Sequence, residues 1–206
     1  MARATIKPAT YVSAGGGEQV NTTTELDHFQ SAANDAPVAT IAIPAGDETR
    51  VNSETASDQN LPAIAGLAGG GTVVVWQSFE SGSYAIYVQR YDVAGAAVGD
   101  ETLVSTPSQS EEAASVAALA DGGYVITWMS TGPEGTDDTG IYAQRFNASG
   151  GLVGPEFHVN TTEAGNQISP SVGALADGGY VVAWTSVGQD AEGSSIHVQR
   201  YDSLGG

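Results

Sequence analysis

The chain has 206 residues, 41% of them apolar and 15% charged, so it is long enough to bury a core and does not have the composition of a disordered protein. Six basic against 24 acidic residues give a formal net charge of −18. This negative field disfavours nucleic acid and anionic lipid surfaces as partners. The absence of cysteine excludes disulfide scaffolds, zinc–thiolate sites and cysteine catalysis, and no apolar run is long enough for membrane insertion.

Residues 1–45 are rich in alanine, threonine and glycine and show no sustained hydrophobic periodicity. We therefore expect an irregular N-terminal leader here. Within it, Glu18–Thr24 resembles the later segment Glu156–Thr162 and is interpreted as a degenerate copy of that element, which Arg50–Ser53 matches more closely.

Internal repetition follows this leader, and we expect three units at about 46–100, 101–155 and 156–206. A block that ends in tryptophan recurs at Trp76, Trp128 and Trp184, and a related block precedes each of them. An Ile-x-x-Gln-Arg block follows each tryptophan, and its arginines are Arg90, Arg145 and Arg200, spaced 55 residues apart in both cases. Three blocks that recur in one order at one period predict a tandem repeat.

Each unit is predicted to form four short strands. In the third unit the first strand covers about 169–175, and the second, at 180–184, is apolar on both faces, as expected of a strand buried between layers. The third strand, at 196–201, alternates between two faces, and the fourth is of the type found at 152–159. The third unit stops within the turn before its own fourth strand, so we expect that unit to be truncated.

Two local patterns bear on this assignment. The pairs Asp121-Gly and Asp177-Gly favour tight type I′ hairpin turns. The segment Glu111–Ala120 has a helical composition, but the corresponding segments of the other units contain Pro62 and Pro170, so a strand is predicted in all three units. The chain is therefore predicted to be nearly all-β.

Half of the six basic residues occupy one repeat position, and we interpret them as structural. A two-residue turn after the third strand would place Arg145 opposite Glu156 and Arg90 opposite Glu101. An exposed cross-strand pair of this kind contributes about 0.2–1 kcal/mol and favours one strand register. The recurring tryptophans are likewise interpreted as core residues.

Four strands in about 55 residues, with a Gly-Gly turn and a recurring tryptophan, resemble one blade of a β-propeller. Closed propellers have at least four blades. The predicted fold is therefore a set of tandem four-stranded antiparallel blades, either an incomplete ring or a fragment of a longer array.

The motif Val-Asn-Thr-Thr…Pro-Ser-Val-x-Ala-Leu-Ala-Asp-Gly-Gly-Tyr-Val-Val-x-Trp, followed by Ile-Tyr-Ala-Gln-Arg-Phe, is similar to a tandem repeat of large secreted proteins of Gram-negative bacteria. These proteins are described as calcium-binding or adhesin-like and are exported by type I secretion. The resemblance covers about residues 46–206 and implies a secreted or cell-surface location, with which the acidic charge and the absence of cysteine agree. The Gly-Gly-x-Gly-x-Asp nonapeptide of repeats-in-toxin calcium rolls is absent from the sequence, so that calcium site is not carried over.

The loops between the second and third strands hold candidate calcium ligands. They contain Asp137 and Asp138 in the second unit, and Asp190 and Glu192 in the third. Calcium binds six to eight oxygen ligands, often on flexible loops. The first unit has one carboxylate in this loop, and a solvated acidic turn is the alternative interpretation. We predict that calcium is a stabilising cofactor bound through these four residues.

Other polar residues form no catalytic pattern in the sequence. No nucleophile elbow, phosphate loop or zinc-protease motif occurs, and no metal-ligand spacing relates the three histidines, His28, His158 and His197. A lectin surface is an alternative use of the aromatic positions Tyr87, Tyr142 and Tyr201. The third unit has His197 at the position of the first two tyrosines, which argues against such a surface.

Together these patterns predict a non-enzymatic extracellular repeat module for structural spacing and adhesion, stabilised by calcium. Its partners would be a cell-surface glycan or a matrix protein, and self-association would complete the β array. The first alternative is a carbohydrate-binding propeller. The second is a propeller-based hydrolase fragment, which needs an acid and a base that converge in one pocket, whereas the carboxylates of the repeat are symmetric.

Overall fold

The computed structural model describes residues 46–105, 110–131, 139–162, 164–188, 193–203 and 205. Within these ranges the chain forms strands and no helix, and hence no helix that could cross a membrane. The strands are β1 (Gln59–Gly66), β2 (Thr72–Glu80), β3 (Ser83–Tyr91), β4 (Ala97–Leu103), β5 (Glu111–Ala118), β6 (Tyr124–Thr131), β7 (Thr139–Phe146), β8 (Leu152–His158), β9 (Asn166–Ala174), β10 (Tyr180–Val187) and β11 (Ser194–Tyr201). The predicted leader, residues 1–45, lies outside the described residues.

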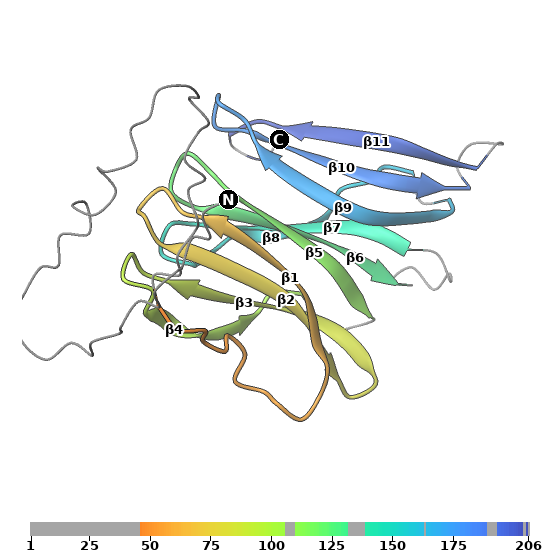
Figure 1. Cartoon of the computed structure of the whole chain (residues 1–206). Helices are drawn as coiled ribbons and strands as arrows, with labels where there is room; N and C mark the ends of the chain where they lie inside the picture. The colour runs from red at the N-terminus through yellow and green to blue at the C-terminus, as the bar shows by residue number, and fades with distance from the viewer. Residues whose placement is uncertain are drawn as a thin grey trace, which may run out of the picture. The chain divides into compact units, whose positions relative to one another are not determined.

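The strands form three antiparallel sheets, one in each repeat (Figure 1). Strands β1–β4 and β5–β8 each form a four-stranded sheet in chain order, and β9–β11 form a sheet with β10 at its centre. The prediction of tandem antiparallel blades is confirmed, and we call these sheets blades one, two and three. The segment of helical composition is β5, because antiparallel pairing with β6 outweighs a weak helix propensity.

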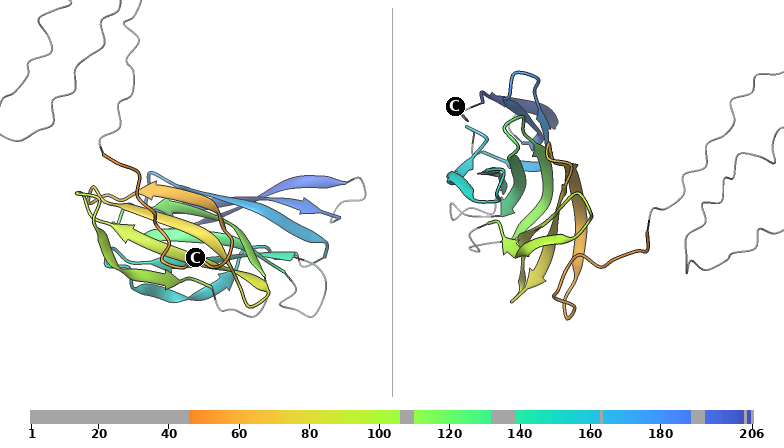
Figure 2. Two further views of the ribbon diagram at one scale, coloured as in Figure 1. Left: turned by 60° about the horizontal axis from the view of Figure 1, so that its bottom comes forward. Right: turned by 90° about the vertical axis from the view of Figure 1, so that its left-hand side faces the viewer.

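The blades stack face to face through two apolar cores (Figures 1 and 2). The first strands of neighbouring blades lie next to one another, β1 beside β5 and β5 beside β9. Blade two is covered on both sides, so that β6 is buried on both faces from Tyr124 to Trp128. The recurring tryptophans are confirmed as core residues, with exposed fractions of 5%, 1% and 7% for Trp76, Trp128 and Trp184.

The first strand of each blade contains a bulge at one repeat position. At the bulge, a residue other than glycine adopts a positive φ: Leu61 (49°), Ala113 (55°) and Ser169 (55°). Because a bulge interrupts the hydrogen-bond ladder, the next residue can be proline, which explains why Pro62 and Pro170 occur inside strands.

The first hairpin of each blade closes through one type of turn. In blade two, Leu119 donates its N–H to the carbonyl of Gly123 at 2.8 Å, and Gly122 has a φ of +86°. The Asp121 carboxylate accepts the N–H of Gly123 at 2.8 Å, as Asp177 does for its own turn. Both aspartates are turn residues, as predicted, but the expected type I′ turn is wrong, because the positive φ belongs to the glycine alone.

The predicted pairing of arginine with glutamate across the third and fourth strands is also wrong. The arginine lies opposite a valine in both four-stranded blades, with Arg145–Val153 in place of Arg145–Glu156 and Arg90–Val98 in place of Arg90–Glu101. The reason is the position of the turn, which covers residues 148–150 instead of 150–151 and is closed by a 2.8 Å hydrogen bond from the N–H of Asn147 to the carbonyl of Gly151. This turn shifts the register by three residues next to the arginine.

A bulge in the fourth strand further changes the register beyond the arginine. At this bulge Gly154 has a φ of +71°, and Nε2 of Gln144 donates to its carbonyl at 3.1 Å. In blade one Gln89 makes the same contact with Gly99 at 3.3 Å. The glutamine of the recurring Gln-Arg pair therefore satisfies a carbonyl at a point where the ladder is interrupted.

Candidate functional site

A hydrogen bond from tryptophan joins the first and second strands of each blade. The indole Nε1 of Trp76 donates to Oε1 of Gln59 at 3.0 Å, and that of Trp184 donates to Oε1 of Gln167 at 2.9 Å. In blade two the acceptor is a carboxyl group, that of Glu111. Sequence reasoning missed these acceptors, although each precedes its tryptophan by 17 residues.

Of the described carboxyl groups, only that of Glu111 is buried, with 2% of the residue exposed. Burial raises its pKa to about 7, hydrogen bonds from Ser130 and Trp128 oppose this rise, and the charge of Glu156 adds to it. A carboxyl group with such a pKa is suited to acid–base chemistry. Its repeat equivalents are the glutamines that accept the same tryptophan bond, which indicates a structural role.

The recurring arginines connect neighbouring blades. Arg90 of blade one donates through Nη1 to the carbonyl of Ser149 at 2.5 Å and through Nη2 to that of Ala148 at 2.7 Å, both in the β7–β8 turn of blade two. Arg145 repeats this contact one blade later, where Nη2 donates to the carbonyl of Ser203 at 3.1 Å. These arginines thus fasten each blade to a turn of the following one.

Arg200, the third member of this series, contacts no turn of a following blade within the described residues. It forms an ion pair with Asp177 of its own blade, as Arg145 also does with Asp121 at 3.6 Å. Its side chain is 65% exposed, compared with 9% for Arg145. The described chain therefore holds an exposed arginine at the position that elsewhere bridges two blades.

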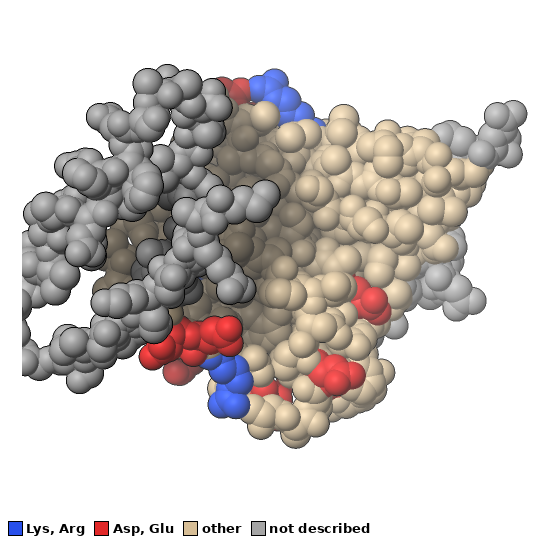
Figure 3. Space-filling view, in the orientation of Figure 1, with Lys and Arg blue, Asp and Glu red and all other residues tan. Residues whose placement is uncertain are grey.

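The outer side of blade three is apolar and exposed. We call it the trailing face, formed by Val181, Ala183, Ile196, Val198 and Arg200, which are paired across β10 and β11. Ile196 is 73% and Val198 is 64% exposed. Residues at the same repeat positions are buried in the other blades, namely Ile86, Val88, Ile141 and Ala143. On the side of the molecule drawn in Figure 3, the described residues present few charged side chains, which lie mainly toward the edges of the view.

The opposite end of the stack is the outer side of blade one, which we call the leading face. It is formed by Ile64, Thr72, Val74 and Trp76, the counterparts of blade-two residues that pack against blade one. Ile64 is 66% exposed, whereas its counterpart Val116 is buried.

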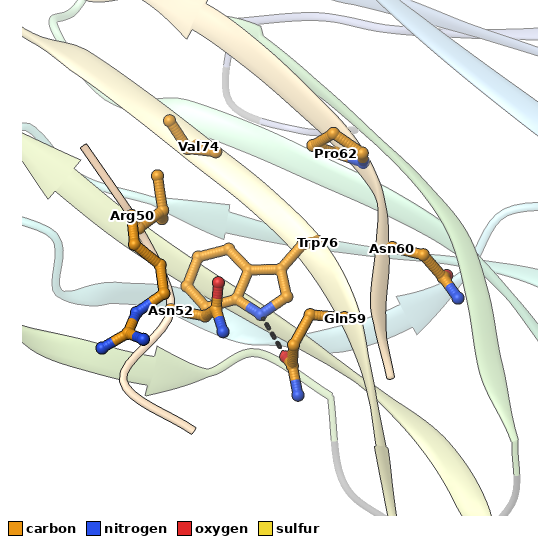
Figure 4. A pocket seen from close by; sticks show the side chains of 8 residues that line it. Arg50, Asn52, Gln59, Asn60, Pro62, Val74 and Trp76 are labelled. Atoms are coloured by element: carbon orange, nitrogen blue, oxygen red, sulfur yellow. Dashed lines mark hydrogen bonds between the residues drawn. The ribbon is translucent and has the colours of Figure 1, made fainter. Parts of the chain in front are cut away.

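The leading face contains a pocket of about 240 Å³. Trp76 and Val74 line it together with residues of β1 and of the segment before β1 (Figure 4). Arg50 and Asn52 lie beside the tryptophan ring, and Gln59 is bonded to the indole nitrogen. The remaining lining residues are Val51, Asn60 and Pro62.

The predicted calcium ligands, Asp137, Asp138, Asp190 and Glu192, all lie outside the described residues. Among the residues that are described, no group of three or more histidine, aspartate or glutamate side chains could hold a metal ion. The calcium site therefore remains a prediction from the sequence.

The aromatic and histidine candidates are distributed over the three blades. The Tyr87 ring stacks on Trp76 and the Tyr142 ring on Trp128. In blade three His197 takes this position on Trp184, with a ring separation of 6.0 Å. Tyr201 stacks on Tyr180, His158 stacks on Tyr142, and His28 lies outside the described residues. Tyr87, Tyr142 and His197 therefore pack on the tryptophan of their own blade, whereas Tyr201 also contacts Phe157 of blade two.

Comparisons with known proteins bear on the fold. No family model and no curated protein matches the sequence. Among solved structures, the chain is similar to α-L-arabinofuranosidase from Lactobacillus brevis, with 9% identity and a TM-score of 0.53 over 76% of this chain and 57% of that one. It is also similar to endo-arabinase from Bacteroides thetaiotaomicron, with 14% identity and a TM-score of 0.48 over 70% and 57%. The chain thus spans a little over half the length of these enzymes, and the likeness to the α-L-arabinofuranosidase supports an all-β, propeller-like fold.

Proposed function

We propose that the chain is a scaffold segment of a secreted β-propeller-like protein, in which it spaces and presents contact surfaces. The observation that supports this proposal is the use of the recurring polar residues. Glutamine or glutamate binds the tryptophan, aspartate closes a turn, glutamine satisfies a bulge and arginine joins two blades. Polar residues that recur in every repeat and make the same contact there stabilise the fold. A catalytic centre instead brings different kinds of polar residue together in one pocket.

The extracellular part of this proposal rests on the sequence. The repeat resembles that of secreted adhesin-like proteins, and a net charge of −18 keeps such a chain soluble and away from anionic surfaces. The proposed partners are a cell-surface glycan or a matrix protein. Binding of the purified chain to a glycan array and to immobilised matrix proteins tests this, and a scaffold should show no binding that free saccharides compete away. Saccharide-competed binding would favour the lectin alternative.

A propeller-based glycoside hydrolase is the second candidate. The likeness to α-L-arabinofuranosidase favours it over the scaffold as an analogy of fold. Within the described residues Glu111 is the carboxyl group with an acid–base pKa, and its partners would come from elsewhere in the protein.

Product release from arabinan and from an aryl α-L-arabinofuranoside separates the two candidates. A scaffold releases no more product than the heat-denatured chain does. Release by the native chain that is lost in Glu111→Gln, while the variant melts at no lower temperature than the wild type, would establish the hydrolase. The glutamine matches Gln59 and Gln167, so this variant is expected to fold.

A further inference from the structure

We propose that the trailing face of blade three binds the leading face of blade one in a second copy of this chain, head to tail. The inference goes beyond the proposed function and does not depend on it. It rests on an interface that the chain already contains twice, between blades one and two and between blades two and three. Among the described residues no blade covers either outer face, and only the segment at residues 50–52 lies against the leading face, beside Trp76.

The apolar halves match by repeat position. Between blades one and two, Ile86 and Val88 pack against Ile126 and Trp128. On the trailing face, Ile196 and Val198 occupy the repeat positions of Ile86 and Val88. On the leading face, Val74 and Trp76 occupy the repeat positions of Ile126 and Trp128. The pocket beside Val74 and Trp76 corresponds by repeat position to the part of blade two against which Ile86 and Val88 of blade one pack. Docking would bury two side chains that are now 73% and 64% exposed.

The polar halves match as well. A Cβ placed on Gly150 would come within 2.8 Å of Nη1 of Arg90, and one placed on Gly205 within 2.9 Å of Nη1 of Arg145, because an arginine of the preceding blade lies against each turn. Gly95 occupies the same turn position in blade one, and its Cβ would meet nothing within 4 Å. One arginine, Arg200, and one turn, that of Gly95, are therefore left over at opposite ends of the stack.

One substitution makes the proposed contact weaker than the internal ones. The Arg145 guanidinium lies 6.0 Å from the centre of the Tyr180 ring, whereas the corresponding residue of blade one is Thr72. The contact between copies therefore lacks a cation–π component. A net charge of −18 on each copy also opposes association at low ionic strength, so association should strengthen as salt screens this repulsion.

Sedimentation velocity of the full chain at physiological salt, over a wide range of concentrations, tests the proposal. Val198→Glu blocks the trailing face and Ile64→Glu blocks the leading face. The wild type should associate with increasing concentration, each variant alone should remain monomeric, and an equimolar mixture should form a one-to-one dimer through the intact face of each. Arg200→Gln should weaken association of the wild type about tenfold.

Val153→Glu is the matched control, because Val153 is an exposed apolar residue of β8 outside both faces. It should associate like the wild type. A wild type that stays monomeric throughout the range would overturn the proposal. So would a face-blocked variant that associates by itself as well as the wild type does, since that would indicate a symmetric contact. Melting curves of each variant confirm that the fold is retained.

Discussion

Glu111 accepts a hydrogen bond from the indole of Trp128 at the position where glutamine serves in the other two blades. A carboxyl group can replace the amide because both offer an oxygen acceptor. The amide stays neutral at every pH, whereas a buried carboxylate must be desolvated when it ionises. This exchange makes the stability of blade two depend on pH.

We predict that Glu111→Gln removes this dependence. The pKa of Glu111 rises from 4.5 to about 7 in the folded chain, so its favourable contribution is present below pH 4.5 and is lost as the pH rises through 7. Glu111→Gln should therefore be more stable than the wild type at pH 8, by about 2 kcal/mol. Urea unfolding at pH 5 and pH 8 measures this. Glu112→Gln is the control, and parallel stability curves for the wild type and Glu111→Gln would contradict the prediction.

We predict that Gly150→Ala destabilises the chain more than Gly95→Ala does. Both glycines have similar positive φ angles, +87° and +80°, so the backbone strain of alanine is alike, at about 1 kcal/mol. Only at Gly150 would the new Cβ displace the Arg90 guanidinium and its bonds to two carbonyls. The expected difference is about 1 kcal/mol more for Gly150→Ala. Urea unfolding at low protein concentration, where chains are separate, measures it; equal effects would contradict the bridging role of Arg90.

We predict that Gln167→Leu costs more than Gln59→Leu. Gln167 is fully buried, so its loss leaves the Trp184 indole N–H without an acceptor in the core, at a cost of about 1–3 kcal/mol. Gln59 lies at the partly exposed end of the stack, where water can replace it as the acceptor for Trp76. Thermal melting of the two variants compares these costs. Equal decreases in melting temperature would contradict the prediction that the buried indole hydrogen bond of Trp184 contributes more to stability than that of Trp76.

We predict that calcium raises the melting temperature through Asp137, Asp138, Asp190 and Glu192, because a ligand that binds only the folded chain stabilises it by mass action. Melting in calcium and in chelator measures the effect. The variant with all four residues changed to asparagine or glutamine should show no calcium response. Identical wild-type curves in calcium and chelator would discard the site.

The repeat made much of the fold predictable, because side-chain periodicity and turn residues are local properties. Trp128 and its counterparts marked the central strand of each blade, and Pro62 and Pro170 ruled out a helix. The register of the fourth strand was not predictable in this way. It depends on a turn closed by Asn147 and on a bulge satisfied by Gln144, and these contacts form only when β7 and β8 are already paired.

The candidate site shows the same division. The sequence presents Ile86-x-Val88 and Ile196-x-Val198 as equivalent pairs, yet the first pair is buried and the second is 73% and 64% exposed. Likewise, Arg90 and Arg200 share one motif but differ in partner, a turn of the next blade for one and Asp177 for the other.

The sequence by itself determined the repeating unit, its strands and its core tryptophans, because each follows from residue type and spacing within about 55 residues. Only the tertiary structure decided which face of each blade is covered, which group each arginine binds and which carboxyl group is buried. The physical reason is that the sequence of a strand with two apolar faces does not specify which of its faces another blade will cover. Burial on each face is set by the blade that packs against it.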